Sequence, residues 1–147
     1  MKGNPEASFN YCLNNLPQND STLFSDASTS WGMAGVILFP LTADYKGFDG
    51  LFWQVSWKVW AKLNPIHNLL PGSIAINVAE FLAALITCET FADLCTGKIT
   101  TIEIDNVSAK SWLESARCPI YPFDRCAQGL HLYMVRRSMK VKATWLP

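Results

Sequence analysis

The amino-terminal half of the chain alternates short apolar runs with polar breaks. Residues 22–29 (TLFSDAST), 33–39 (MAGVILF) and 51–58 (LFWQVSWK) are rich in β-branched and aromatic residues, which predicts three strands. Gly32 supplies backbone freedom for a turn between the first two, and residues 40–50 indicate a loop. Such short connections join strands in antiparallel order, so we expect a three-stranded meander.

After the third predicted strand, the spacing of apolar residues changes from the alternation of a strand to the three- and four-residue spacing of a helix. Residues 59–73 form a connection with two prolines, and a helix is expected from about residue 74 to 94, with Gly97 as its stop. Its apolar positions are Val78, Phe81, Leu82, Leu85, Ile86 and Phe91. After it we expect strands at 99–105 and 140–146 and helices at 107–115 and 122–138. The order βββαβααβ predicts an α/β fold, a five-stranded mixed sheet whose right-handed crossover makes part of it parallel, flanked by helices.

Length and composition fit one domain with a sizeable core. The chain has 147 residues, of which half are apolar and 16% are charged. Residues 1–21 are rich in Asn, Pro, Ser and Asp, so we expect a linker or disordered lead-in, followed by the domain at 22–147. Six Trp and eight Phe are many for this length and indicate a dense core or an apolar surface for a neighbouring domain.

Charge and cysteine content narrow the class further. The formal net charge is zero, so any electrostatic footprint for nucleic acid must be local. The late basic cluster could contact phosphates or simply be a solvated helix end; its members are Arg136, Arg137, Lys140 and Lys142. Five cysteines without CxxC spacing favour neither a disulfide framework nor a zinc site, and predict an intracellular location, cytoplasm or nucleus. The amino terminus lacks the apolar core of a signal peptide, and no apolar run is long enough to span a membrane.

Three carboxylates lie inside apolar elements, where a lone charge is costly. Asp26 is in the first strand, Glu80 is near the start of the long helix, and Asp105 ends the fourth strand. If the first and fourth strands are neighbours, the helix crossing between them can bring all three together. Their mutual repulsion should raise at least one pKa, and hard divalent cations would relieve it. Two magnesium or manganese ions can hold a phosphodiester for attack by water.

Each carboxylate also has a purely structural interpretation. Asp26 could close a turn, and Asp105 with Asn106 could form a strand-end turn or a helix cap. Asn77 could be a helix N-cap with Glu80 three residues later, as in a capping box. Taken singly, none of the three positions decides between structure and catalysis.

In combination, three segments resemble the carboxylate motifs of ribonuclease H type 1 domains. The segments are FSDASTSWGMAGVI, INVAEFLAAL and IEIDNVSAKSWL, and the closest likeness is to retrotransposon reverse transcriptases. The ending KATWLP resembles the family's last strand, so the resemblance covers about residues 22–147. The order Asp, Glu, Asp differs from that of retroviral integrases, which place their Glu last.

The resemblance implies a ribonuclease H-like fold and a metal-dependent endonuclease that hydrolyses the RNA strand of RNA–DNA hybrids, as part of a retroelement reverse transcriptase. It implies that Asp26, Glu80 and Asp105 are catalytic and bind Mg²⁺ or Mn²⁺, as two ions. By the same resemblance, the partners of this chain would be the RNA–DNA hybrid and an adjoining reverse transcriptase domain. Candidate substrate contacts are Ser28, Asn77 and Asn106, the two asparagines near the 2′-hydroxyl that distinguishes RNA from DNA.

The chain also departs from that family. Its members carry a fourth carboxylate, an Asp on a helix after the last strand, and this chain ends at Pro147, so we expect the domain to lack that helix. Asp124 lies in the wrong element to replace it, and neither His67 nor His131 matches the histidine that some members have beside it. Either the chain is truncated, or the missing part comes from elsewhere, or the domain is a catalytically weak or inactive scaffold or interaction domain.

The series Trp53, Trp57 and Trp60 has two interpretations. It could form a platform on which bases stack. Core packing, together with contact to an adjoining domain, is the preferred one.

Overall fold

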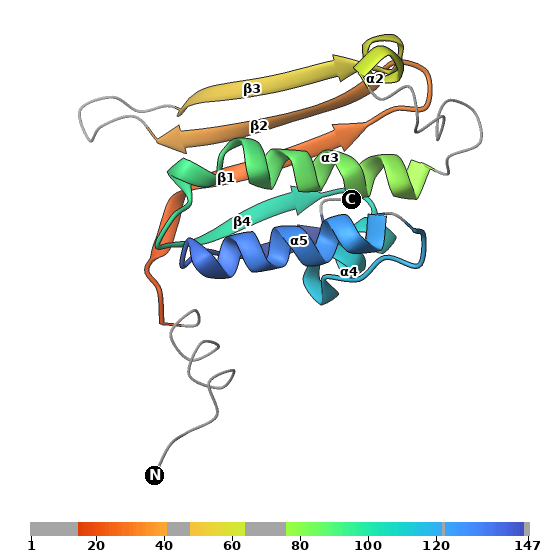
Figure 1. The fold of residues 1–147 in the computed structure, drawn as a ribbon. Helices are drawn as coiled ribbons and strands as arrows, with labels where there is room; N and C mark the ends of the chain where they lie inside the picture. Colours follow the sequence, from red (N-terminus) through yellow and green to blue (C-terminus); the bar gives the residue numbers. More distant parts are fainter. Residues whose placement is uncertain (1–14, 41–47, 64–75, 122, 146–147) are drawn as a thin grey trace.

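A computed structural model describes residues 15–40, 48–63, 76–121 and 123–145 (Figure 1). The expected lead-in falls mostly on residues 1–14, outside this part. The elements in chain order are β1 (Gln18–Ala27), β2 (Gly32–Pro40), β3 (Phe48–Ser56), α2 (Trp57–Leu63), α3 (Ile76–Thr90), the 3₁₀ helix η1 (Ala92–Leu94), β4 (Ile99–Ile104), α4 (Val107–Ser115), α5 (Phe123–Arg136) and β5 (Lys140–Trp145).

The five strands form one mixed sheet in the order β3-β2-β1-β4-β5. Strands β1, β2 and β3 are antiparallel neighbours, whereas β4 pairs parallel with β1, and β5 pairs parallel with β4. This confirms the predicted fold class, an antiparallel meander followed by a parallel crossover. Figure 1 shows α3, α4 and α5 gathered on one side of the sheet.

The core lies between that side of the sheet and α3. Alternate strand residues point towards the helices, and Leu23, Ile37 and Ile102 are fully buried there. Helix α3 is buried around most of its circumference, because the sheet lies beneath it and α4 and α5 pack beside it. Two thirds of its residues are accordingly apolar, and Glu80 stands out as the carboxylate buried among them. In the described part of the chain no helix is long and apolar enough to cross a membrane.

Helix α3 comes unusually close to β2 at Gly35. The Trp53 indole N–H, from β3, donates to Thr87 Oγ1 at 2.9 Å, and the Thr87 hydroxyl donates to the Ala83 carbonyl at 2.7 Å. A Cβ atom at Gly35 would lie 2.0 Å from Thr87 Oγ1 and 2.4 Å from Trp53 Nε1. The glycine therefore makes room for the hydrogen bond between β3 and α3.

We expect Gly35→Ala to lower the free energy of unfolding by roughly 1–3 kcal/mol, because the added methyl group overpacks this contact. Urea denaturation measures the change. Gly129→Ala in α5 is the matched control, since a Cβ there meets nothing within 4 Å. It should stabilise the helix by up to about 1 kcal/mol. Equal stability of Gly35→Ala and the unchanged protein would contradict the close approach.

The first strand begins earlier than expected, at Gln18, inside the segment interpreted as lead-in. Asn19 is buried, and its side-chain amide donates to the Leu94 carbonyl and to Thr100 Oγ1, both at 3.0 Å. These partners are 75 and 81 residues away in the chain. The polar side chain of Asn19, part of the composition that suggested a linker, thus makes tertiary hydrogen bonds.

Other boundaries also differ from the prediction. The third strand ends at Ser56, and the short helix α2 follows where residues 59–73 were expected to be irregular. The Ser56 hydroxyl accepts a hydrogen bond from the Val59 N–H at 3.2 Å, which supports this helix start. The long helix ends at Thr90, and η1 replaces its expected last turn.

The other side of the sheet carries an apolar hollow. Phe24, Val36 and Phe52 are cross-strand neighbours on β1, β2 and β3, and the Phe52 side chain is 70% exposed. They line a cavity of about 330 Å³ whose lining residues come from strands β1–β4 and Asp105, and from no described helix. Asp26 and Glu103 also line it, so its apolar floor adjoins acidic side chains.

A candidate metal centre at the ends of β1 and β4

Parallel pairing places Asp26 and Asp105 side by side. Phe24 on β1 pairs with Glu103 on β4, so the two aspartates, each two residues further on, lie at equivalent positions on the same sheet face. Glu80, from the second turn of α3, reaches the same place from the helix side. One carboxylate oxygen from each of the three residues lies within 4.8 Å of the others. The expected convergence of the three carboxylates is present.

The three carboxylates differ in environment. Glu80 is 3% exposed, whereas Asp26 and Asp105 are exposed to solvent. The Ala27 N–H donates to both Asp26 Oδ1 at 2.9 Å and Glu80 Oε1 at 3.1 Å. The second oxygen of Glu80, Oε2, is buried and has no hydrogen-bond partner in the described structure. A buried acceptor without a partner is costly, so this oxygen calls for a proton or a cation.

The pKa of Glu80 is raised to about 8, and burial is the largest cause. The nearby Asp26 side chain and the negative charge of Asp105 act in the same direction, while the hydrogen bond from the Ala27 N–H lowers the pKa. The expectation that one carboxylate of the cluster has a raised pKa is confirmed. The expected cause is corrected, because desolvation contributes more than repulsion between like charges.

The cluster suits a hard divalent cation. The ion pairs found within the described residues, Lys110–Glu114 and Arg137–Asp93, involve none of its carboxylates. Three carboxylates with an unpartnered buried oxygen, and without an ion-pair partner among the described residues, match the all-oxygen ligand set that Mg²⁺ and Mn²⁺ prefer.

Asn106 and Asn77 connect two helices beside the cluster. Asn106 caps α4, because its Oδ1 accepts the Ala109 N–H at 2.8 Å, and its amide donates to Asn77 Oδ1 at 2.7 Å. The helix-cap interpretation is thus correct for Asn106. The capping-box alternative is wrong, because Asn77 lies inside α3, which begins at Ile76, and Glu80 hydrogen-bonds to Ala27 in β1.

We expect Asn106→Ala to cost about 1 kcal/mol of stability through the lost cap, in addition to the lost bond to Asn77. Asn77→Ala loses only the bond between the two side chains and should therefore be milder. Thermal unfolding of the two variants makes the comparison. Equal destabilisation by both would show that the cap contributes nothing.

Ser28 shapes the turn between β1 and β2. Its hydroxyl accepts the Trp31 N–H at 3.0 Å, its carbonyl accepts the Trp57 indole N–H at 2.7 Å, and its N–H donates to the Gly32 carbonyl at 2.9 Å. Ser28, rather than Asp26, therefore holds this turn. Its expected contact with substrate stays a prediction.

The tryptophan series belongs to the interior. Trp57 is buried in the core, and Trp53 and Trp60 are half-buried and pack against it. This confirms the core-packing part of the interpretation.

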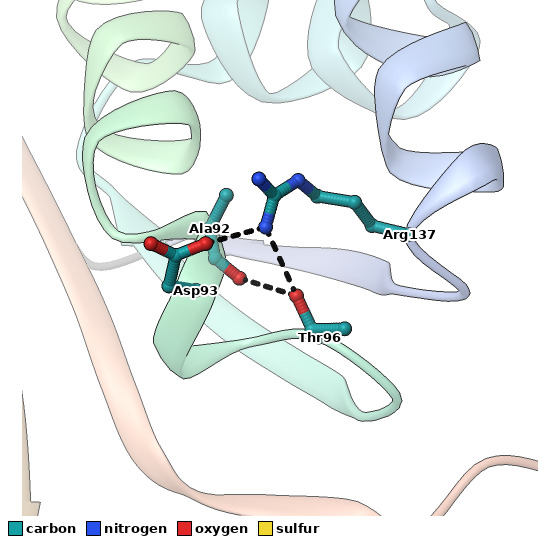
Figure 2. A network of polar contacts seen from close by, with 4 residues as sticks. All are labelled: Ala92, Asp93, Thr96 and Arg137. Atoms are coloured by element: carbon teal, nitrogen blue, oxygen red, sulfur yellow. Dashed lines mark hydrogen bonds and ion pairs between the residues drawn. The ribbon is translucent and has the colours of Figure 1, made fainter.

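The late basic cluster lies away from the carboxylates. Figure 2 shows Arg137, at the end of α5, hydrogen-bonded to Asp93 and Thr96, with the Thr96 hydroxyl donating to the Ala92 carbonyl. The guanidinium also lies 4.7 Å from the centre of the Tyr133 ring. These partners follow α3 at the end opposite to Glu80, so Arg137 joins α5 to the α3–β4 connection instead of lining the site.

The other residues considered from the sequence lie outside the cluster. Asp124 accepts the Cys118 N–H at 3.0 Å at the start of α5, and His131 is exposed on that helix. His67 lies outside the described residues. The four described cysteines, Cys88, Cys95, Cys118 and Cys126, are free, in keeping with the absence of an expected disulfide framework.

Two exposed tryptophans beside the site were not singled out from the sequence. Trp31 occupies the turn after β1, and Trp145 ends β5. An aromatic residue in a polar turn, between Ser30 and Gly32, was the available signal for the first. The second resembled an ordinary strand residue.

The sheet order, the crossover and the flanking helices define a ribonuclease H-like fold. Among solved structures, the chain is similar to RNase H1 from the halophilic archaeon Halobacterium salinarum NRC-1, with 14% identity, a TM-score of 0.51, and coverage of 86% of this chain and 85% of that one. The N-terminal RNase H domain of rv2228c from Mycobacterium tuberculosis shares 13% identity with this chain, with a TM-score of 0.48. The match covers 86% of this chain and 85% of that one. No family model and no curated protein matches the sequence. The likeness in structure shows the fold.

Proposed function

We propose that this chain is a metal-dependent endonuclease that hydrolyses the RNA strand of RNA–DNA hybrids. The observation that carries the proposal is the convergence of the three carboxylates of the cluster, one oxygen from each lying within 4.8 Å of the others. The solved structures of similar fold are named as RNase H1 and RNase H domains, which supports the same class of substrate.

In this proposal the three carboxylates hold Mg²⁺ or Mn²⁺, as two ions. When bound, the metal activates water and stabilises the charge that develops on the phosphodiester. Asp26 and Asp105 are exposed, so the cations that they would hold could be reached by a phosphate arriving from solvent. Glu80 is buried and has a raised pKa, so it would have to release its proton in order to serve as a ligand for a cation.

The asparagine pair is the proposed reader of the RNA strand. Asn77 lies one helical turn before Glu80, and Asn106 follows Asp105 directly. Their mutual hydrogen bond leaves the Asn77 amide N–H groups without a partner in the described structure. A donor held beside the carboxylates suits the 2′-hydroxyl of a ribose.

The finer proposal is that the domain belongs to a retroelement reverse transcriptase. The three motif segments that resemble those enzymes support it. The open apolar hollow formed by Phe24, Val36 and Phe52 supports an adjoining domain, since large exposed apolar patches mark interaction sites.

A scaffold without activity is the second candidate. One observation favours it: the cluster found among the described residues holds three carboxylates, whereas the ribonuclease H family that the sequence resembles has four. The experiment that separates the two candidates uses a hybrid with a labelled RNA strand. Cleavage of the RNA, with the DNA strand left intact, should require Mg²⁺ or Mn²⁺. Binding of hybrid without cleavage in either metal would favour the scaffold.

A further inference from the structure

The two exposed tryptophans lie at the same edge of the sheet as the carboxylates. Trp31 is 49% exposed and Trp145 is 52% exposed, whereas the other four tryptophans are buried or half-buried. Leaving a large aromatic ring in water at two places beside one site is unusual where the rest of the chain buries its indoles.

Trp31 is held on a fixed piece of backbone. Its N–H donates to the Ser28 hydroxyl at 3.0 Å, and its carbonyl accepts the Trp57 N–H at 2.8 Å. The next residue, Gly32, lies so close to β3 that an added Cβ would be 2.0 Å from the Val55 carbonyl oxygen. The turn is therefore anchored on both sides while the indole of Trp31 points into solvent.

Trp145 is tied directly to a residue of the cluster. It is the last residue of β5 and pairs with Ile104, at the end of β4. Its indole N–H donates to the backbone carbonyl of Asp105 at 3.2 Å. The ring is thus fixed against the segment that carries one of the proposed metal ligands.

The strand order sets the spacing of these groups. Along this edge the neighbours are the start of β2 after Trp31, the end of β1 with Asp26, the end of β4 with Asp105, and the end of β5 with Trp145. Three strand spacings of about 4.8 Å place the tryptophans on the order of 14 Å apart. That distance corresponds to about four nucleotides at roughly 3.4 Å each. The aspartates lie in the middle.

We propose that Trp31 and Trp145 contact substrate, each packing against the sugar of a nucleotide about two positions from the scissile phosphate, one on each side. The inference rests on the proposed function. In a paired hybrid the base faces are stacked on one another, so the sugars and the minor-groove edges are the surfaces that a flat apolar ring can reach. Two aromatic contacts that flank the carboxylates would fix which phosphate reaches them.

The test compares binding of hybrid with its cleavage. Trp31→Ala and Trp145→Ala should each raise the Kd for hybrid, measured in EDTA by fluorescence anisotropy, about tenfold. Single-turnover cleavage in Mg²⁺ gives a second measurement. The protein concentration that gives half of the maximal rate should also rise about tenfold, while the maximal rate itself should change less than about threefold. The double variant should lose about a hundredfold, because distant contacts add. Phe at either position should restore most of the affinity.

Leu94→Ala is the matched control, an exposed apolar side chain beyond the far end of α3, and it should leave Kd and cleavage unchanged. If the unchanged protein binds and cleaves hybrid and both alanine variants bind equally well, the inference fails while the proposed function stands. A lowered saturating rate with unchanged Kd would also overturn it, since the rings would then act on the cluster alone. If the unchanged protein neither binds nor cleaves hybrid, both fail, and the exposed rings would instead indicate a protein partner.

Discussion

Asp26→Asn and Asp105→Asn should each lower magnesium-supported cleavage of the RNA strand by more than about 100-fold. Each substitution keeps the shape of the side chain and removes one negative ligand from a cluster whose oxygens lie within 4.8 Å. Glu80→Gln should lose activity to a similar extent. Gel analysis of a labelled hybrid under single-turnover conditions measures the rates, and circular dichroism shows whether each variant is folded.

Asp20→Asn is the matched control for the two aspartate variants. Asp20 is an exposed residue on the same strand as Asp26, and it lies outside the cluster. Its substitution should leave the rate within about twofold, which separates loss of a ligand from a general loss of negative charge. A folded Asp26→Asn protein that cleaves as fast as Asp20→Asn would exclude the nuclease proposal and favour the scaffold.

The sheet and the meeting of the carboxylates were predictable because both follow from local pattern and simple topology. Alternating apolar residues marked the strands, and a helix between two strands implies a parallel crossover. Once β1 and β4 are parallel neighbours, residues at equivalent ends must meet, which is why Asp26 and Asp105 could be paired from the sequence.

What could not be predicted depends on partners far away in the chain. The strand at Gln18 depends on Asn19, whose partners lie 75 and 81 residues on. The dominant effect on the pKa of Glu80 is burial, which is set by the elements packed around α3. Exposure of Trp31 and Trp145 is likewise a property of the folded surface, since a tryptophan in sequence is as easily interpreted as core.

The metal-free protein should lose stability as the pH rises from about 4.5 to about 8. Glu80 has a pKa raised from 4.5 to about 8 in the folded state, so between these values the folded chain binds a proton that the unfolded chain has released. Stability therefore falls with increasing pH across this window and levels off above it. At about 1.4 kcal/mol per pKa unit, the loss is on the order of 5 kcal/mol.

Glu80→Gln isolates this effect, because Gln has nearly the same shape and cannot ionise. In EDTA the variant and the unchanged protein should be about equally stable below pH 4.5, and above pH 8 the variant should be more stable by on the order of 5 kcal/mol. Urea denaturation across this range measures the difference, and Glu114→Gln, an exposed carboxylate in α4, should follow the unchanged protein.

Magnesium should reverse the order of the two proteins at high pH. The cation binds the ionised cluster in the folded state and stabilises it by mass action, so the unchanged protein should gain stability at pH 8 with increasing Mg²⁺. Glu80→Gln has already lost that ligand and should gain much less. Parallel pH curves for the two proteins in EDTA would show that Glu80 is ionised in the folded state without metal. The buried carboxylate would then have another partner, and the cluster would not need a cation to balance it.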